Sequence, residues 1–210
     1  QGRMGQAIVR LAEDKPTIIV VAKTGRSDLT TLKEVPEFDV AIDFSSPDGF
    51  FAVLALCVER KKALVSGTTG LSDEQFSSLQ SAGLLMPVLW GSNCSVGVAV
   101  LKQLVSQAGK WLKDWDIDIT EAHHIHKKDA PSGTALSLGQ TVQTATGIAP
   151  NYLSLRCGDV IGEHTVQFAS TGERLELTHR ATNGDIFANG ALFAAGKLSA
   201  KPNGDYQCAD

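Results

Sequence analysis

The stretch Asp39–Phe44, with the sequence DVAIDF, stands directly before residues that favour the start of a helix. It is a short apolar run containing β-branched residues, which is typical of a buried strand. Ser46 can cap the helix that follows, Pro47 suits the first helical position, and Asp48 lies favourably in the first turn. We therefore predict a strand followed by a helix over residues 48–62.

This strand–helix pattern extends on both sides of the stretch. A second helix is predicted over residues 73–82. Three more short apolar runs are predicted strands: Thr17–Ala22, Ala63–Ser66 and Pro87–Trp90. Because strands that alternate with helices usually pair in parallel, we predict an α/β fold with a parallel sheet.

A glycine-rich turn, Gly2-Arg3-Met4-Gly5, leads at once into a helical pattern. In dinucleotide-binding folds such a turn follows the first strand, so we expect a Rossmann-like domain whose first strand is missing from the sequence. The free amides at the helix N-terminus would favour an anion such as a pyrophosphate. A tight turn before an ordinary helix explains the same residues equally well.

The pattern changes near residue 95. A helix with apolar positions between Val100 and Leu112 is followed by sequences that alternate between apolar and polar residues. These predict three strands: Asp116–Thr120, Thr165–Phe168 and Arg174–Thr178. Such alternation indicates strands with one covered face and one polar or partner-facing face.

Two domains are expected from this change. Residues 1–94 and 183–210 would form the Rossmann-like domain, which a helix over Ala188–Ala200 would rejoin. Residues 95–182 would form a smaller α+β domain.

Composition excludes several classes of function. The chain has 210 residues, of which 43% are hydrophobic, and this is enough for one large or two small cores. Its net charge of −4 provides no positive field for a nucleic acid. No apolar run approaches the about 20 residues that span a membrane, and no leader pattern opens the chain, so we expect a cytoplasmic protein. The four cysteines lack metal-binding spacing and are expected to be free thiols.

The segment EAHHIHKKDAPSGTA, residues 121–135, carries the densest set of reactive side chains. It joins a predicted strand to a helix with an amphipathic pattern. Ser132, Gly133 and Thr134 would present hydroxyls and amides at the helix N-terminus, where a carboxylate can bind. Lys127 and the histidines add donors beside it, so we favour a site for an anionic substrate with acid–base help.

Two alternatives for this segment stay open. Charge runs usually face water, so it could be a solvated basic loop. It could also hold a metal, since His124 and His126 can share a strand face, although no acidic or thiol partner has suitable local spacing.

Two further loops follow predicted strands, at Gly67-Thr68-Thr69-Gly70 and at Gly91-Ser92-Asn93-Cys94. Open α/β sheets bind ligands at the carboxyl ends of their parallel strands. Ordinary turn preferences would produce either loop without a ligand.

Taken together, these motifs resemble the 4-hydroxy-tetrahydrodipicolinate reductase (dihydrodipicolinate reductase) family over nearly the whole chain. The matching sequences are GRMG, DFSSP, GTTG, SNCSVGV, EAHHIHKKDAPSGTA and GERLELTHRA. The resemblance implies that NADH or NADPH gives a hydride to a cyclic imine dicarboxylate in lysine and diaminopimelate synthesis. It also implies a homotetramer assembled through the sheets of the substrate domain. From the ligand spacing, we expect no metal.

The resemblance further implies roles for individual residues. His123 would be catalytic, and Lys127 would donate the proton. The substrate-binding positions would be His124, Ser132, Gly133, Thr134 and Thr69. The cofactor-binding positions would be Gly2, Arg3, Met4, Gly67, Thr68, Thr69, Gly91, Ser92, Asn93 and Cys94.

The cofactor loops depart from the family pattern at two places. Cys94 stands where an aromatic residue is expected. After the predicted strand Thr17–Ala22, Lys23 and Arg26 stand where an acid would bind the ribose diol. These cations would suit a 2′-phosphate, so we expect no strong preference for NADH.

The substrate domain departs at two further places. The segment Asn151–Arg156 is much shorter than its family counterpart, and we expect residues to be missing near 152–158 and also near 24–31. The sequence Thr182–Asp185 replaces a position often held by arginine.

Two other functions remain as alternatives. An amino-acid dehydrogenase on the same architecture would need a site with a single carboxylate anchor. A cofactor-binding sensor or inactive homologue would have no need for both His123 and Lys127.

Overall fold

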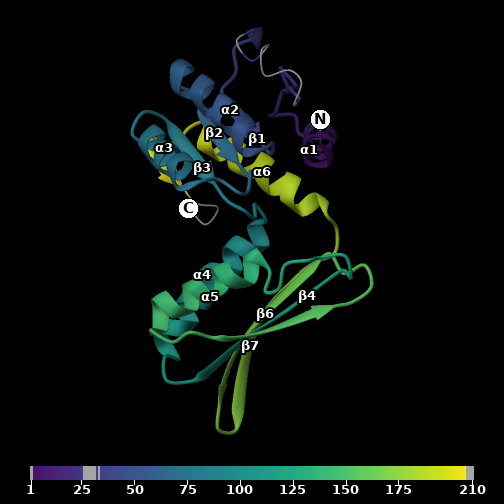
Figure 1. Ribbon diagram of the computed structural model, residues 1–210, viewed down its shortest axis with the longest axis vertical. Helices are drawn as coiled ribbons and strands as arrows, with labels where there is room; N and C mark the ends of the chain where they lie inside the picture. Colours follow the sequence, from purple (N-terminus) through teal and green to yellow (C-terminus); the bar gives the residue numbers. More distant parts are fainter. Residues whose placement is uncertain (1, 26–31, 33, 207–210) are drawn as a thin grey trace. The chain divides into compact units, whose positions relative to one another are not determined.

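A computed structural model of the protein describes residues 2–25, 32 and 34–206 (Figure 1). The elements of the N-terminal part are α1 (Arg3–Glu13), β1 (Val40–Asp43), α2 (Pro47–Arg60), β2 (Ala63–Ser66), α3 (Asp73–Gly83) and β3 (Pro87–Trp90). They are followed by α4 (Val96–Trp111), β4 (Asp116–His123), α5 (Gly133–Thr146), β5 (Asn151–Arg156), β6 (Gly162–Ser170), β7 (Glu173–Ala181), α6 (Asp185–Leu198) and β8 (Gly204–Tyr206).

The chain divides into two compact units. The first contains the described residues of 1–95 and 185–206, and the second contains Val96–Gly184. Among the described residues, no helix combines the length and the apolar character needed to cross a membrane.

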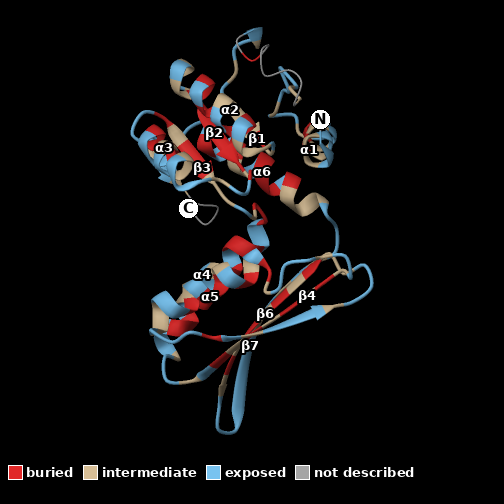
Figure 2. Ribbon diagram, in the orientation of Figure 1, coloured by how far each residue is buried: buried red, intermediate tan, exposed pale blue. Residues whose placement is uncertain are grey.

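The first unit contains a parallel sheet with the strand order β1-β2-β3-β8. Neighbouring residues of β2 point to opposite faces, and each face is covered by helices. Leu64 packs with Phe50 of α2 and Leu79 of α3, whereas Val65 packs with residues of α1 and α6 such as Ala191. These buried residues form the core seen in Figure 2. The predicted Rossmann-like α/β fold is confirmed.

Local signals in the sequence correctly placed the start of α2 and the strands β2 and β3. The side chain of Ser46 accepts a hydrogen bond from the Gly49 N–H, and Pro47 begins α2. The predicted strands at Ala63–Ser66 and Pro87–Trp90 are observed with the same bounds. Both predictions hold because caps and short apolar runs depend on adjacent residues.

The predicted strand at Thr17–Ala22 is wrong. The segment has no regular structure, and Ile19 is 83% exposed. A strand requires a hydrogen-bonded neighbour, and none of the described residues pairs with this segment. β8 was not predicted, because its three residues, GDY, carry no apolar run.

The second unit contains a mixed sheet with the order β5-β4-β6-β7. β4 is parallel to β5 and antiparallel to β6, which forms a hairpin with β7. Helices α4 and α5 cover one face, where Val105 and Leu138 pack against Ile119 and Val166. The predicted α+β character of this unit is confirmed.

β5 was not predicted, because four of its six residues are exposed and its apolar residues face outward. Its pairing with β4 runs without interruption from Asn151 to Arg156, and the Cys157 N–H continues it to the His123 carbonyl at 2.9 Å. That residues are missing within 152–158 stays a prediction. Most of the other segment, residues 26–31, lies outside the described residues.

The close packing of α6 gives a stability test. A Cβ at Gly190 would overlap the Cys94 carbonyl oxygen, whereas a Cβ at Gly196 in the same helix would meet open space. We expect Gly190→Ala to lower the free energy of unfolding by about 1–3 kcal/mol. Gly196→Ala should leave it unchanged or raise it by up to about 1 kcal/mol. Urea unfolding of both variants measures the difference, and equal effects would contradict this packing.

Candidate active site

The site in the second unit begins with the alternation of β4. Ile117 and Ile119 point toward the helices, and the same face continues with Glu121 and His123. The strand therefore carries two polar side chains into a buried position, at the end where α5 begins.

Glu121 has no exposed surface and lies at the centre of this group. The Arg156 guanidinium donates from Nη1 to Oε2 at 3.0 Å and from Nη2 to Oε1 at 2.9 Å. The Ser132 N–H donates to Oε1 at 3.2 Å, and His123 Nδ1 lies 2.5 Å from Oε2. Each carboxylate oxygen thus has two donors.

These donors determine the charge of Glu121. Burial raises the pKa of the Glu121 carboxyl, but hydrogen bonds from Arg156, Ser154 and His123 outweigh burial and bring the pKa to about 2. The group is a carboxylate at neutral pH, and so His123 Nδ1–H is the donor in the bond between them.

His123 is almost fully buried. Burial lowers the pKa of its imidazole, Glu121 raises it, and Lys127 and Arg156 lower it, with a net lowering. The ring of His164 stands edge-on to it at 5.2 Å between centroids. A Cβ at Gly162 would come within 3.1 Å of His123 Nε2, so the glycine leaves room at that edge.

The N-terminus of α5 adjoins this pair. The Ser132 hydroxyl caps the helix by accepting from the Ala135 N–H, and it also forms a hydrogen bond with His164 Nε2 at 3.0 Å. Burial and the neighbouring His123 lower the pKa of His164 to about 4. A Cβ at Gly133 would meet open space. The Ser132 hydroxyl thus forms its hydrogen bonds within the protein, whereas the helix faces open space at Gly133.

The loop after β4 supplies the cations. Lys127 Nζ lies 2.8 Å from Asp129 Oδ1, and this contact lowers the pKa of Asp129. His124 and His126 lie 6.2 Å apart between ring centroids. Among the described residues, no group of three or more His, Cys, Asp or Glu side chains is arranged to hold a metal.

In the first unit, the predicted cofactor loops follow β2 and β3. The Thr68 hydroxyl donates to the buried Asp43 carboxylate at 2.7 Å, and the Thr68 carbonyl accepts from Trp90 Nε1. The Cys94 side chain is buried, whereas Thr69 and Ser92 are exposed. Contacts of Thr68 and Cys94 with a cofactor would therefore use their backbone atoms.

The predicted pyrophosphate site lies at the start of α1. Gly2 is the N-cap, no side chain caps the helix, and its first turn contains no acidic residue. A Cβ at Gly2 would meet nothing within 4 Å. An uncapped, unobstructed helix N-terminus beside Arg3 fits a phosphate group. Lys23 is exposed, and Arg26 lies outside the described residues.

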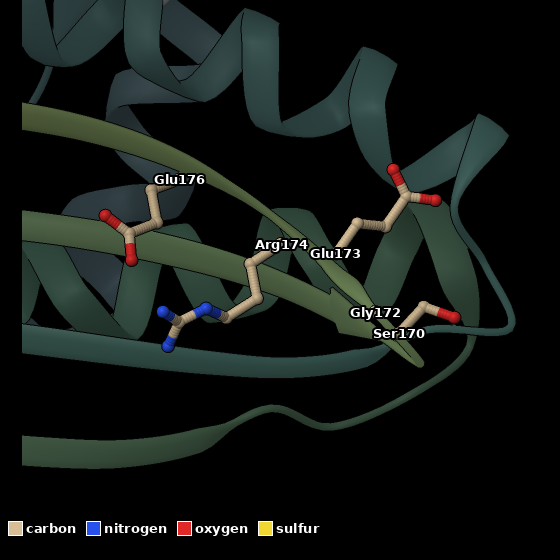
Figure 3. A pocket seen from close by; sticks show the side chains of 5 residues that line it. All are labelled: Ser170, Gly172, Glu173, Arg174 and Glu176. Carbon is tan, nitrogen blue, oxygen red and sulfur yellow. The ribbon is translucent and has the colours of Figure 1, made fainter.

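A surface hollow of about 570 Å³ lies elsewhere, at the turn between β6 and β7 (Figure 3). Its lining residues are Ser170, Gly172, Glu173, Arg174 and Glu176. Because β6 begins beside His123 and ends at Ser170, this hollow is at the opposite end of the sheet from the buried carboxylate. It is separate from the candidate site.

Sequence analysis did not identify Glu121, Arg156 or His164 as site residues. Continuing the period-two alternation of β4 past Thr120 would have placed Glu121 inside the unit. Arg156 carried no such signal, because it belongs to an edge strand without an apolar pattern.

The fold and the site together are typical of an oxidoreductase, with a Rossmann-like unit and a second unit that carries the buried Glu121–His123 pair. The N-terminal and C-terminal family models of dihydrodipicolinate reductase match residues 1–94 and 97–210. The chain therefore belongs to the 4-hydroxy-tetrahydrodipicolinate reductase (dihydrodipicolinate reductase) family.

Individual relatives agree with this assignment. The 4-hydroxy-tetrahydrodipicolinate reductase of Xanthomonas axonopodis pv. citri is 53% identical over 222 aligned residues, covering 100% of this chain and 93% of the relative. A dipicolinate-bound dihydrodipicolinate reductase from Paenisporosarcina sp. TG-14 has a TM-score of 0.80 at 20% identity, over 99% of this chain and 94% of that one. An engineered D-amino acid dehydrogenase shares the fold, with a TM-score of 0.59 at 10% identity over 100% of this chain and 92% of that one.

The Glu121 network predicts a pH-dependent stability. The folded pKa of about 2 lies below the ordinary value of 4.5, so the ionised carboxylate stabilises the fold above about pH 4.5. This contribution is lost as the pH falls toward about 2. Arg156→Met leaves the carboxylate buried without its main partner and should lower the free energy of unfolding at pH 7 by about 3–5 kcal/mol.

The difference in the free energy of unfolding between the wild type and Arg156→Met should become smaller below about pH 4.5. There the wild type begins to lose the stabilisation that the ionised Glu121 provides. Arg180→Met is the matched control, because Arg180 forms an exposed ion pair with Glu163 at 3.1 Å, and it should cost less than about 1 kcal/mol. Urea unfolding at pH 7 and pH 4 measures both variants. A large deficit that does not change with pH would show that the Glu121 charge is not involved.

Proposed function

We propose that the protein reduces the cyclic imine dicarboxylate derived from 4-hydroxy-tetrahydrodipicolinate to tetrahydrodipicolinate, in lysine and diaminopimelate synthesis. The observation that carries the proposal is the group at the end of β4, where the buried Glu121–His123 pair adjoins the α5 N-terminus and precedes the loop with Lys127. Two substrate carboxylates require such a combination of cations and free amides. Family membership supports the same reaction.

The first unit would bind NADH or NADPH, which supplies the hydride. The α1 N-terminus, with Gly2, Arg3 and Met4, would hold the pyrophosphate. The loops at Gly67–Thr69 and Gly91–Cys94 would contact the nicotinamide and its ribose. They follow the carboxyl ends of β2 and β3, where parallel sheets bind ligands.

Lys127 would supply the proton. Hydride addition to a conjugated imine moves an electron pair to the ring nitrogen, which then takes up a proton. The lowered pKa of His123 leaves its imidazole neutral near pH 7, and its Nδ1–H is bound to Glu121. The Lys127 ammonium therefore has the proton to give, while His123 offers Nε2 to the substrate.

The substrate carboxylates would bind beside these residues. Gly133 and Thr134 stand in the first turn of α5, and a helix N-terminus favours an anion such as a carboxylate. His124 would add a side-chain contact. Ser132 would act through the helix cap, since its hydroxyl is already hydrogen-bonded to the Ala135 N–H and to His164 Nε2.

The proposal extends to the oligomeric state of the protein and to its location in the cell. The outer face of the second sheet exposes Leu153 and Leu155 by 51% and 54%, and a homotetramer would bury these side chains between subunits. A biosynthetic enzyme that uses a nicotinamide cofactor would act in the cytoplasm.

Removal of the acid–base groups tests the proposed site. We expect Lys127→Ala and His123→Ala each to lower kcat by about 100-fold or more, the usual effect of losing a positioned acid–base group. Lys128→Ala is the matched control, because its exposed side chain is the next in the chain and should leave kcat unchanged. Cofactor oxidation, followed by absorbance with freshly generated substrate, measures all three. Wild-type turnover in both site variants would reject the assignment.

The cofactor preference is a second test. In the sequence, Lys23 and Arg26 occupy the positions at which the family resemblance predicts an acid that binds the ribose diol, and their charges would attract a 2′-phosphate. We expect kcat/KM for NADH to exceed that for NADPH by less than tenfold. Lys23→Asp should shift the ratio toward NADH, because a carboxylate repels the 2′-phosphate. A tenfold or greater NADH preference in the wild type would reject the role of these cations.

A further inference from the structure

We infer that Glu121 is a positioning residue, whose buried carboxylate fixes the orientation and tautomer of His123 and joins it to helix α5 and to Arg156. The inference rests on the proposed role of His123 in the reaction. Glu121 itself is placed away from substrate, because none of its surface is exposed.

The first support is the complete use of the carboxylate. Oε1 accepts from the Ser132 N–H and from Arg156, and Oε2 accepts from His123 and from Arg156. These donors come from β4, from β5 and from the start of α5. An aliphatic residue would fill the same space but would leave the buried Ser132 N–H and the buried His123 Nδ1–H without this acceptor, at a cost of about 1–3 kcal/mol each.

The second support is the placement of the His123 ring. Its Nδ1–H points to Glu121, so the neutral ring carries its free electron pair at Nε2. The Nε2 edge lies beside Gly162, where a Cβ would come within 3.1 Å of Nε2, so a side chain at this position would crowd the ring. Glu121 therefore determines which ring nitrogen can meet a substrate.

The third support is the balance of charges around His123. The groups that face it are Glu121 on β4, Arg156 on β5, His164 on β6, and Lys127 and Asp129 in the following loop. Glu121 raises the pKa of His123, whereas burial, Lys127 and Arg156 lower it. Replacing the carboxylate with a neutral group removes the main influence that raises this pKa and leaves the three that lower it.

The experiment compares Glu121→Gln with the wild type by ¹⁵N NMR of the histidine rings and by steady-state kinetics. We expect the titration midpoint of His123 to fall by about one unit or more, the usual effect of removing an adjacent opposite charge. The acidic limb of the kcat/KM profile should move to lower pH with it. We also expect kcat to fall about tenfold or more, with a smaller change in KM.

Glu163→Gln is the matched control. It makes the same substitution on the same sheet, at a carboxylate whose ion pair with Arg180 is exposed, and it should change neither the titration nor kcat. A folded Glu121→Gln variant whose His123 midpoint and kcat match the wild type overturns the inference.

A second variant covers the case in which Glu121→Gln does not fold. Arg156→Lys keeps a positive charge but loses the two-pronged contact that holds the carboxylate. It should lower kcat several-fold and disturb the ¹⁵N signal of His123, while KM changes little. Unchanged kcat and ring signals would overturn the inference.

The two hypotheses fail in different ways. If His123→Ala retains wild-type turnover, the role of His123 in catalysis is wrong. The His123 midpoint in Glu121→Gln still measures whether Glu121 controls that ring.

Discussion

The carboxylate of Glu121 is a fully buried anion, and the residues of the proposed substrate site are arranged around it. Burying such a charge is costly unless every lone pair finds a donor. The Arg156 fork, the Ser132 N–H and His123 Nδ1–H meet this requirement. The same bonds fix the end of β4 to β5 and to the first turn of α5, so the orientation of the histidine and the direction of the helix N-terminus depend on one ionised group.

The first unit also contains a buried carboxylate, next to one of the loops proposed to bind the cofactor. Asp43 ends β1 and is 3% exposed, and it accepts hydrogen bonds from Ser45, Ser66 and Thr68 at 2.5–2.8 Å. These hydroxyls belong to the ends of β1 and β2 and to the loop that follows β2. A buried carboxylate thus holds the loop containing Thr69 in one conformation. In both units, a rigid strand end supports residues that a cofactor or substrate would contact.

The sequence predicted the features that depend on neighbours along the chain. The Ser46 cap and the segment from His123 to Ser132 could be recognised because their residues are contiguous. The Thr17–Ala22 strand failed because pairing requires a partner elsewhere in the structure. The pairing of Glu121 with Arg156 joins residues 35 positions apart through the register of an edge strand. No local pattern encodes that register, so the central contact of the site could only come from the three-dimensional structure.

The charge of Glu121 can be observed directly by ¹³C NMR of the glutamate side-chain carboxyl carbons. In the wild type, the Glu121 signal, assigned by comparison with Glu121→Gln, should remain that of a carboxylate well below pH 4.5, the ordinary pKa of a glutamate, consistent with a pKa of about 2. A Glu121 midpoint at or above 4.5 would show that the buried group is not held as an anion, and would contradict the account of the site.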